Sequence, residues 1–255
     1  MPLEIITIPC LQDNYAYLAH DSASGATAVV DIPDAAPLLA ELSNRNWTLS
    51  HVLITHHHDD HIQGLAALLA KFPAKVFGAK ADAHRLPHLD VALTEGDTIQ
   101  IGTDTGHVID VSGHTKGHIA FHFPKSDAVF TADSLMALGC GRLFEGTGAQ
   151  MWSSLSKLAA LPTDTIVYSG HEYTAANAKF ALTIEPDNPD LISRSEQITA
   201  ARSTQTPTVP SRLSLELATN PFLRAAIPSV QSNVGMSGAD PAEVFTEIRA
   251  RKDRF

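Results

Sequence analysis

The chain has 255 residues, of which 44 % are hydrophobic and 18 % charged, and its formal net charge is -10 at pH 7. A chain of this size can bury one large core, or a core and a smaller second domain. The acidic balance disfavours nucleic acid as a partner, because phosphate binding requires a basic surface. An anionic substrate would therefore have to meet a local cluster of cations.

The sequence contains no long apolar run, and Met1–Glu4 lacks the basic start and apolar segment of a secretory signal. The two cysteines, Cys10 and Cys140, form no C-x-x-C pair, as is usual in a reducing compartment. We therefore expect a cytoplasmic protein without a membrane partner or a nucleic-acid partner. We also expect it to be a monomer.

Short apolar runs separated by turns predict a series of β-strands up to residue 172. The predicted strands, in chain order, are Ile5–Ile8, Tyr15–Ala19, Ala28–Asp31, Val52–Thr55, Lys75–Gly78, Thr98–Ile101, Val108–Val111, Ile119–Phe123, Ala128–Thr131 and Thr165–Ser169. Helical periodicity interrupts the strands at Ala35–Asn44, Gln63–Phe72 and Met151–Leu161. Many strands with few helices predict packed sheets whose outer faces are covered by helices, which is an α/β (α+β) architecture.

The pattern becomes helical beyond residue 172. The predicted helices are Tyr173–Ile184, Pro189–Ser203, Leu213–Thr219 and Pro241–Lys252. The last of these has a clear start signal, with Asp240 as N-cap and Glu243 placed for a capping box. The Gly/Ser-rich stretch Ser229–Gly238 is expected to be a loop. We therefore predict a catalytic domain over residues 1–172 and a small helical domain over residues 173–255.

The run Thr55–His61 is the part of the chain richest in metal-binding side chains, and it directly follows an apolar strand-like stretch. Read as H-x-H-x-D-H, it supplies four candidate ligands: His56, His58, Asp60 and His61. This mixture of imidazole and carboxylate suits zinc and other divalent transition metals. We expect an extended strand end in which alternate side chains share a face, so that His57 and Asp59 point away from the metal.

Three further candidate ligands stand where other predicted strands give way to loops: His114, Asp133 and His171. Catalytic residues are often held on loops at one rim of a rigid sheet, so we expect these three to converge with the first cluster. A lone strand-end histidine is usually structural, which is our interpretation of His20, His51, His84, His88, His107 and His122. His118 is expected either to orient its loop or to support a ligand from behind.

Together these motifs resemble the metallo-β-lactamase superfamily. The resemblance is carried by T-H-x-H-x-D-H, by G-H-T-x-G-H at Gly113–His118, by the aspartate in Thr131–Ser134 and by the histidine in Gly170–Tyr173. Longer strings resemble the hydroxyacylglutathione hydrolase (glyoxalase II) family: Gly139–Gly146, Gly170–Thr174, Asn220–Arg224 and Arg249–Phe255. The resemblance implies a four-layer αββα sandwich followed by a small C-terminal α-helical domain.

The resemblance also implies two divalent metal ions per chain, zinc in the first place and iron or manganese as alternatives that the same ligands accept. The implied ligands are His56, His58 and His114 for one ion and Asp60, His61 and His171 for the other, with Asp133 bridging the two. Asp60 and Asp133 are thereby implied to be catalytic residues as well as ligands.

The implied activity is hydrolysis of S-(2-hydroxyacyl)glutathione, such as S-lactoylglutathione, by a hydroxide shared between the metals. The products are glutathione and a 2-hydroxy acid, lactate in this case, which completes methylglyoxal detoxification. A thioester is a suitable substrate because its leaving thiol, with an ordinary pKa of roughly 8.5, departs without a strong general acid.

Five residues are implied to bind this glutathione thioester: Arg142, Phe144, Tyr173, Arg249 and Lys252. Arg249 and Lys252 are three apart on one predicted helix, so they share a face and would supply the local cations. Phe144 lacks the hydroxyl of the tyrosine that some relatives have at this position, so that contact is open.

Each of these residues also has a structural interpretation. Arg142 could pair with Glu145, Arg249 and Lys252 could form a solvated helix face, and Tyr173 could be a packed aromatic. Cys140 is interpreted as a small packed residue in a glycine-rich loop.

Other functions are weighed against the hydrolase. A single-iron persulfide dioxygenase lacks the extended helical C-terminal part, whereas a hydrolase of another thioester or of a lactone remains open. The acidic charge opposes a nuclease, and His58 stands where a flavodiiron oxidoreductase would have a carboxylate. A non-catalytic protein braced by metal would have a closed four-ligand site, so seven ligands favour an enzyme.

Overall fold

The computed structural model describes all residues from 1 to 255, which fold into two compact units. Unit 1 comprises Met1–Asp110 and Lys116–Thr131, and unit 2 comprises Val111–Thr115 and Ala132–Phe255. The boundaries of these units lie elsewhere than the predicted domain boundary after residue 172, which stays a prediction. None of the helices is both long enough and apolar enough to cross a bilayer.

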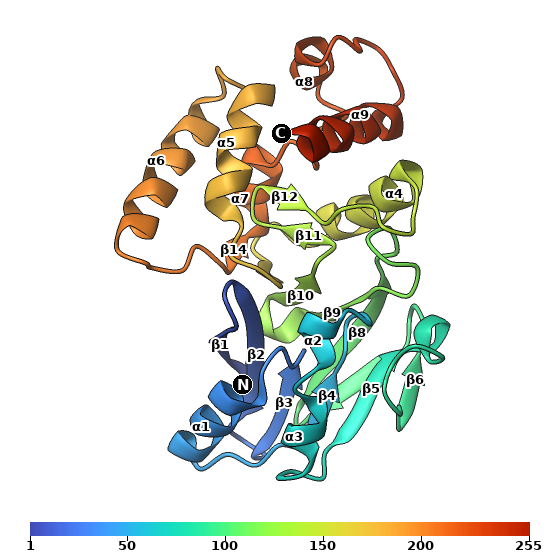
Figure 1. Ribbon diagram of the computed structural model, residues 1–255, viewed down its shortest axis with the longest axis vertical. Coiled ribbons are helices and arrows are strands. Elements are labelled where there is room, and N and C mark those ends of the chain that lie inside the picture. Colours follow the sequence, from blue (N-terminus) through green and yellow to red (C-terminus); the bar gives the residue numbers. More distant parts are fainter. The chain divides into compact units, whose positions relative to one another are not determined.

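Unit 1 contains a six-stranded mixed sheet (Figure 1). Its strands, in spatial order, are β1 (Glu4–Cys10), β2 (Asn14–Asp21), β3 (Ala26–Val30), β4 (His51–Leu53), β5 (Lys75–Ala79) and β6 (Val91–Leu93). The first three strands pair antiparallel, and β3 to β6 pair parallel. Parallel pairing puts the carboxyl ends of β3 and β4 at the same edge of the sheet, so Asp31 and the Thr55–His61 run, which follow them, lie together.

The other sheet of unit 1 is an antiparallel meander. Its strands are β7 (Thr98–Ile101), β8 (Asp104–Asp110), β9 (Ile119–Phe123) and β10 (Ala128–Ala132), of which β10 belongs to unit 1 up to Thr131. The two sheets pack face to face, since the ring of Tyr17 in β2 lies 5.6 Å from the ring of Phe130 in β10. Apolar side chains fill the space between them, which gives unit 1 its core.

Helix α1 (Ala35–Arg45) lies against α3 (Leu65–Leu69) in unit 1 (Figure 1). Asp34 caps α1 by accepting from the backbone N–H of Ala36 at 2.9 Å, and the helix buries Leu38 and Leu42. The helix therefore presents an apolar stripe to the core, as its sequence predicts.

The helix predicted over Gln63–Phe72 is present but shorter, as α3 (Leu65–Leu69), and a further helical turn that was not predicted, α2 (Asp59–Ile62), precedes it. They are separated at Gly64, whose N–H donates to the carbonyl of Ile32 at 2.9 Å. A side chain at Gly64 would lie 2.8 Å from the backbone nitrogen of Ala35, so only glycine fits. Asp60 and His61 therefore lie in a helical turn, and the expectation of an extended strand end is wrong for them.

Unit 2 is mainly helical and has short strands. The strands are β11 (Leu135–Met136), β12 (Gly139–Cys140), β13 (Ile166–Ser169) and β14 (Ser211–Arg212); the helices are α4 (Gly148–Ala159), α5 (Thr174–Ile184), α6 (Pro189–Ser203), α7 (Leu213–Thr219), α8 (Pro228–Asn233) and α9 (Pro241–Arg254). Helix α8 overlaps the first part of the stretch Ser229–Gly238 that was expected to be a loop, so that expectation is wrong for residues 229–233. Pro228 starts this helix, a position that proline favours.

The N-cap of α9 is confirmed, because the Asp240 side chain accepts from the N–H of Ala242 at 2.8 Å. The capping box predicted between Asp240 and Glu243 does not form, because the Asp240 side chain accepts from Ala242 instead. A capping box forms instead at α4, where Thr147 and Gln150 bond reciprocally.

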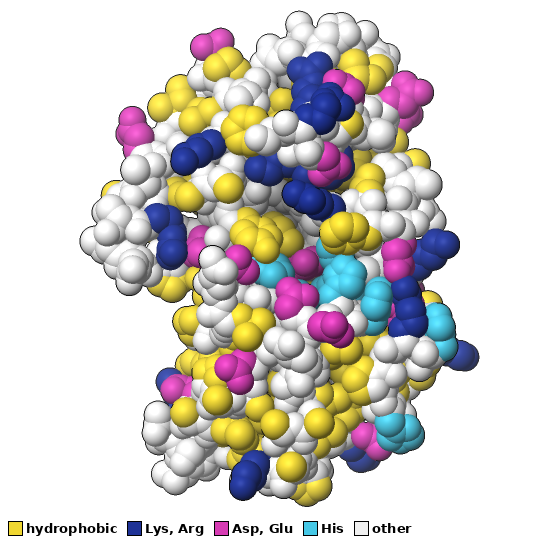
Figure 2. Space-filling view, in the orientation of Figure 1, with side chains coloured by type: hydrophobic (Ala, Val, Ile, Leu, Met, Phe, Trp, Pro, Cys, Tyr) yellow, Lys and Arg dark blue, Asp and Glu magenta, His cyan; other side chains and the backbone are white.

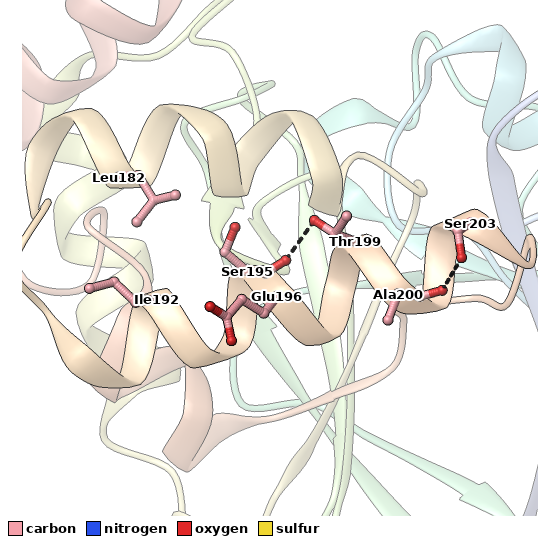
Figure 3. Close-up of a pocket in the computed structure, with 7 residues that line it drawn as sticks. All are labelled: Leu182, Ile192, Ser195, Glu196, Thr199, Ala200 and Ser203. Atoms are coloured by element: carbon pink, nitrogen blue, oxygen red, sulfur yellow. Dashed lines mark hydrogen bonds between the residues drawn. The ribbon is translucent and has the colours of Figure 1, made fainter.

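Helices α5 and α6 pack side by side in unit 2, and Figure 3 shows the groove between them. The groove is lined by Leu182 and by one side of α6, where the hydroxyls of Thr199 and Ser203 donate to carbonyls of their own helix at 2.9 and 2.7 Å. The buried residues of this region form one apolar cluster: Leu138, Ala178, Ala181, Leu191 and Ile198. Hydrophobic burial therefore holds the helical part together.

Candidate metal and substrate site

The first ligand group comprises the four candidates of unit 1: His56, His58, Asp60 and His61. Atom Nε2 of His56 lies 3.2 Å from Nδ1 of His58, and the rings of His56 and His61 are 4.2 Å apart. Oδ2 of Asp60 lies 3.8 Å from Nε2 of His61. Figure 2 shows histidine and acidic side chains next to one another at the surface near α2. The structure therefore brings all four side chains of this group together.

The protonation of two of these histidines follows from their hydrogen bonds to Thr55 and Asp31. Thr55 donates its hydroxyl to Asp31 at 2.8 Å, so the same oxygen accepts from Nδ1 of His56, 3.0 Å away. Nδ1 of His61 lies 2.8 Å from Asp31 Oδ2, and since the carboxylate can only accept, His61 donates. Both rings therefore carry a proton on Nδ1 and, when neutral, present a lone pair on Nε2, the form that binds a metal.

Asp31 is the centre of this support. The side chain is buried, and it also accepts from the backbone N–H of Thr55 at 2.9 Å. It has a positive φ of 56°, a conformation that aspartate and asparagine adopt more readily than other non-glycine residues. Asp31, at the end of β3, therefore holds Thr55 and His61 in the run that follows β4.

Asn14 orients the carboxylate of the first ligand group. It is 5 % exposed, and its Nδ2 donates to Oδ2 of Asp60 at 3.0 Å and to the main-chain oxygen of Asp60 at 3.1 Å. One amide therefore fixes both the rotamer and the backbone of this residue. Asn14 starts β2, directly before the apolar strand residues.

His57 and His118 flank the first ligand group without belonging to it. Nδ1 of His57 lies 3.0 Å from a carboxylate oxygen of Asp82, so its ring is turned toward that residue. The ring of His118 is stacked on that of His56, with centroids 4.6 Å apart and an angle of 12° between the planes. His118 is fully buried, which places it behind the candidate ligand His56 rather than at the surface.

The second ligand group comprises the three candidates of unit 2: His114, Asp133 and His171. Oδ2 of Asp133 lies 3.5 Å from Nε2 of His114, and Oδ1 of Asp133 lies 3.4 Å from Nε2 of His171. The N–H of Gly170 donates to the carbonyl of Ala132 at 3.0 Å, which ties together the segments that carry Asp133 and His171. The structure therefore brings these three side chains together, with each carboxylate oxygen beside a different imidazole.

A main-chain carbonyl fixes the tautomer of His114. Its Nδ1 lies 2.8 Å from the carbonyl oxygen of Arg142, which can only accept, so Nδ1 carries the proton and Nε2 is the basic atom. Gly141 allows this approach, since a Cβ there would lie 2.0 Å from the carbonyl oxygen of Asp133 and 2.8 Å from Nδ1 of His114. Close packing around the second ligand group thus explains Gly141 within the glycine-rich string Gly139–Gly146.

The spacing of the donor atoms fits a divalent metal ion. Two nitrogens bound tetrahedrally to one zinc, at about 2.0–2.1 Å each, would lie about 3.3 Å apart. The nitrogen–nitrogen distance in the first group is 3.2 Å, and the nitrogen–oxygen distances in the second are 3.4 and 3.5 Å. These distances, the Nε2 lone pairs and the His/Asp donor set support the binding of divalent metals by this protein.

Two aromatic side chains pack on the imidazoles of unit 2. The ring of Tyr173 stacks on that of His171 with centroids 4.7 Å apart and planes within 7°, and Phe144 meets His114 edge to face at 5.2 Å. Their exposed fractions are 39 % and 63 %. Each aromatic residue therefore has one side against a candidate ligand while much of its surface faces solvent.

Arg249 and Lys252 lie on α9 but have different surroundings. Arg249 is 5 % exposed; it donates to the carbonyl of Cys140 at 3.0 Å and to Asp253 at 2.8 Å, and it lies over the ring of Phe222. Lys252 is half-buried, with its ammonium 5.2 Å from the ring centres of both Phe180 and Phe255. The expected shared face is therefore only partly accessible.

Burial lowers the pKa of Lys252 below its ordinary value, and the positive charges of Arg249 and Arg142 lower it further. Three of the implied substrate residues, Arg142, Arg249 and Lys252, therefore lie close enough together in unit 2 for their positive charges to act on one another. Figure 2 shows Lys and Arg side chains gathered in the part of unit 2 that carries α9. An acidic protein thus has a concentrated region of positive charge.

Cys140 does not offer a nucleophile in this region. The thiol is buried, and burial raises its pKa to about 11 although the Arg249 guanidinium partly opposes the shift. At neutral pH the group is therefore a thiol and not a thiolate, which agrees with its interpretation as a packed residue.

Sequence reasoning found the candidate ligands but missed three residues that hold the first group: Asn14, Asp31 and Asp82. Asp31 had a usable signal, because it directly follows a buried strand that is parallel to the strand before the ligands. Asn14 lies 46 residues from Asp60 along the chain, and Asp82 lies 25 residues from His57, the neighbour of two candidate ligands. Nothing local in the sequence indicates those two contacts.

Two family models match the chain. The model described as "Metallo-beta-lactamase superfamily" matches residues 21–171, and that described as "Hydroxyacylglutathione hydrolase C-terminus" matches residues 172–255. Among curated relatives, the hydroxyacylglutathione hydrolase of Jannaschia sp. (strain CCS1) is 68 % identical over 99 % of this chain and 98 % of its own length. That of Ruegeria pomeroyi is 65 % identical over the full length of both.

Solved structures share the fold at low sequence identity. ETHE1 from Myxococcus xanthus is similar with a TM-score of 0.67 and 24 % identity, over 98 % of this chain and 90 % of that one. A metallo-β-lactamase from Staphylococcus aureus is similar with a TM-score of 0.65 and 18 % identity, over 98 % and 71 %. These likenesses show the metallo-β-lactamase fold, and the matches together confirm the predicted fold class.

Proposed function

The chain belongs to the hydroxyacylglutathione hydrolase family of the metallo-β-lactamase superfamily, and from this premise we propose that it hydrolyses the thioester of S-(2-hydroxyacyl)glutathione. With S-lactoylglutathione the products are glutathione and lactate, the second step of methylglyoxal detoxification. The observation that carries the proposal is the 68 % identity to a hydroxyacylglutathione hydrolase over 99 % of the chain. Identity of this extent covers both the metal-binding strings and the helical C-terminal strings.

We propose two divalent ions, preferably zinc, as cofactors. The proposed ligands are His56, His58 and His114 for one ion and Asp60, His61 and His171 for the other, with Asp133 shared. When bound, such a pair of ions lowers the pKa of a water molecule towards neutrality and polarises the thioester carbonyl. The hydrogen bonds of His56, His61 and His114 support this proposal, because each presents Nε2 as the basic atom.

The protein's own groups supply orientation. Asp60 is held by the amide of Asn14, and Asp133 has one oxygen beside each histidine of the second ligand group. Groups held in advance act on the reaction without reorganising during it, which is the main advantage of a fixed polar site. The leaving thiol of a glutathione thioester needs no strong acid, so the absence of a dedicated proton donor among the proposed residues is chemically consistent.

Substrate binding is assigned to residues of unit 2: Arg142, Phe144, Tyr173, Arg249 and Lys252. Glutathione has two carboxylates, and Arg142 and Lys252 are the cations most able to meet them. Arg249 is buried and donates to the Cys140 carbonyl. We therefore propose that it contributes positive charge and holds the loop around Cys140, without contacting the substrate. We propose residues 173–255 as the substrate-binding domain, since three of these residues belong to it.

We also propose that the protein acts in the cytoplasm as a monomer. Gel filtration with light scattering at micromolar concentration tests the second point. A dimer mass would overturn it without affecting the proposed chemistry.

The test of the function is a steady-state assay on protein of measured metal content, with a panel of acyl-glutathione and acyl-coenzyme A thioesters. We expect S-lactoylglutathione to have the highest kcat/KM and the coenzyme A thioesters to be poor substrates. Equal use of both thiol carriers, or turnover of lactones in preference, would show a different substrate class. Oxygen consumption with glutathione persulfide, and no thioester hydrolysis, would show a dioxygenase instead.

A further inference from the structure

Asp82 is a buried carboxylate of unit 1 that belongs to neither ligand group. It is 1 % exposed and ends the short helix η1 (Lys80–Asp82), which follows β5. The carboxylate accepts from Nδ1 of His57 at 3.0 Å and from Nε and Nη2 of Arg85 at 3.2 and 2.6 Å. A buried acid is costly unless it is paired and hydrogen-bonded, and these bonds meet that condition.

The bond to His57 reaches into the first ligand group. His57 stands between His56 and His58, and its ring lies 4.9 Å from that of His58. Because the His57 side chain is tied to Asp82, the backbone on both sides of it is held in one path. The neighbouring imidazoles are then presented from a fixed main chain.

Asp82 also supports the segment that carries His118. A Cβ at Gly117 would lie only 2.2 Å from Cγ of Asp82, so the glycine backbone packs directly on this carboxylate. His118 follows at once, and its ring is stacked on His56 at 4.6 Å. The Asp82 carboxylate therefore contacts two separate segments, one at His57 and one at Gly117. Each segment has a neighbouring residue at the same place: His56 in the first and His118, which stacks on it, in the second.

The two segments are also joined by the backbone. The N–H of Ile119 donates to the carbonyl of Thr55 at 3.0 Å, directly before His56 and directly after His118. Arg85 is 30 % exposed at its side chain and neutralises Asp82 from the solvent side. Asp82, His57, Gly117 and the neighbouring pair His56 and His118 are thus linked by successive contacts, and Asp82 is the buried residue that joins the two segments.

We propose that Asp82 is a positioning residue for metal binding, which braces the His56–His58 segment against the Gly117–His118 segment. The brace keeps Nε2 of His56 and Nδ1 of His58 at the spacing that a single ion needs. It also explains why a glycine stands at the fifth position of G-H-T-x-G-H in this chain. The inference rests on the proposed function only in taking His56 and His58 as ligands.

The test is Zn²⁺ binding to the metal-free protein, measured by competition with a chromophoric chelator. In Asp82→Asn the amide is nearly the same size, but its NH₂ faces the Nδ1–H of His57 or the guanidinium of Arg85, so one of the bonds is lost. We expect the zinc affinity of the site that contains His56 and His58 to fall about 10- to 100-fold, as is usual when a residue that hydrogen-bonds near a metal ligand is removed. Thermal unfolding of the metal-free variant establishes that it is folded.

Asp21→Asn is the matched control, because Asp21 is likewise buried in unit 1 and accepts from Ser24 and Thr103. It should lower the unfolding temperature and leave zinc affinity within about twofold, in line with distant independent sites. Unchanged zinc affinity in Asp82→Asn overturns the inference. A loss that equals that of Asp21→Asn overturns it too, because the effect is then general destabilisation.

A double-mutant cycle with His57→Phe tests the route of the effect. Phenylalanine keeps a ring but removes the bond to Asp82, so the double variant should lose little more zinc affinity than Asp82→Asn alone. Fully additive losses overturn the brace. If Asp82→Asn does not fold, His57→Phe alone must still weaken zinc binding. Unchanged zinc affinity in His57→Phe would then overturn the inference. Since no thioester is used, failure here is separate from failure of the proposed hydrolysis.

Discussion

The two ligand groups are built in different ways. The first comes from one run of six residues and is held from behind by side chains: the carboxylates of Asp31 and Asp82 and the amide of Asn14. The second comes from three separate segments and is held by a main-chain carbonyl and by two aromatic rings, one stacked and one edge to face. Candidate ligands that are neighbours on one run have polar side chains as partners, whereas those at separate strand ends are placed by the sheet and loop backbone.

The largest expected effect is that of Asp133→Ala, at the residue of the second group that we propose to be shared by the two ions. Removing a carboxylate with one oxygen beside each histidine should reduce metal content and lower kcat at least about 1000-fold, since metal-assisted steps contribute several kcal/mol and each 1.36 kcal/mol is tenfold. Metal analysis and initial rates on S-lactoylglutathione measure this. Retention of both full metal content and full activity would remove the residue from the site.

The next prediction compares the two kinds of support directly. Asp31→Asn preserves the size and the tolerance of positive φ, but it replaces an acceptor of Thr55 and His61, so zinc affinity should fall about 10- to 100-fold. Arg142→Ala keeps the carbonyl that fixes His114 and should leave zinc affinity unchanged. A chelator competition on both variants measures the contrast, and equal losses would contradict it.

A smaller effect is expected in the cation region of unit 2. Lys252→Ala should raise KM for S-lactoylglutathione about tenfold, about 1.4 kcal/mol, while kcat stays close to that of the parent, because the contact is remote from the reacting carbonyl. Lys252→Arg is the control that keeps the charge. A fall in kcat with constant KM would place Lys252 in a different role.

The smallest effect concerns pH. The pKa of Lys252 is lowered by burial, so its positive charge is lost at a pH below that of an ordinary lysine, and KM should rise as the pH approaches 10. In Lys252→Arg the guanidinium stays charged, and KM should be flat over the same interval. A parent enzyme with a pH-independent KM up to that pH would show that the ammonium does not bind substrate.

The sequence predicted most elements of the fold because their signals are local. Periodicity and proline positions identified α6 and α7 with the bounds that the structure has, and alternation identified β7 and β9 equally well. The failures have physical causes. Helix α3 starts at Leu65 instead of Gln63 and ends at Leu69 instead of Phe72, and the close contacts of Gly64 with Ile32 and Ala35 leave no room for a side chain before it. Two-residue strands such as β11 and β12 are too short to produce a pattern.

For the candidate site, residue chemistry at strand ends was sufficient to select side chains that the structure brings together, but the side chains that hold them depend on contacts distant in sequence. Asn14 and Asp82 are ordinary polar residues until the fold places them beside Asp60 and His57. Burial is equally invisible in the sequence. Helical spacing puts Arg249 and Lys252 on one face, yet only the structure shows that Arg249 is enclosed and bonded to the Cys140 carbonyl.

The most direct test of the whole account is a metal titration of the metal-free protein, with zinc uptake and S-lactoylglutathione hydrolysis followed in the same samples. The account predicts that activity is negligible without metal, rises with added zinc and reaches its plateau at two ions per chain. Full activity in metal-free protein, or a plateau at a single ion, would contradict it.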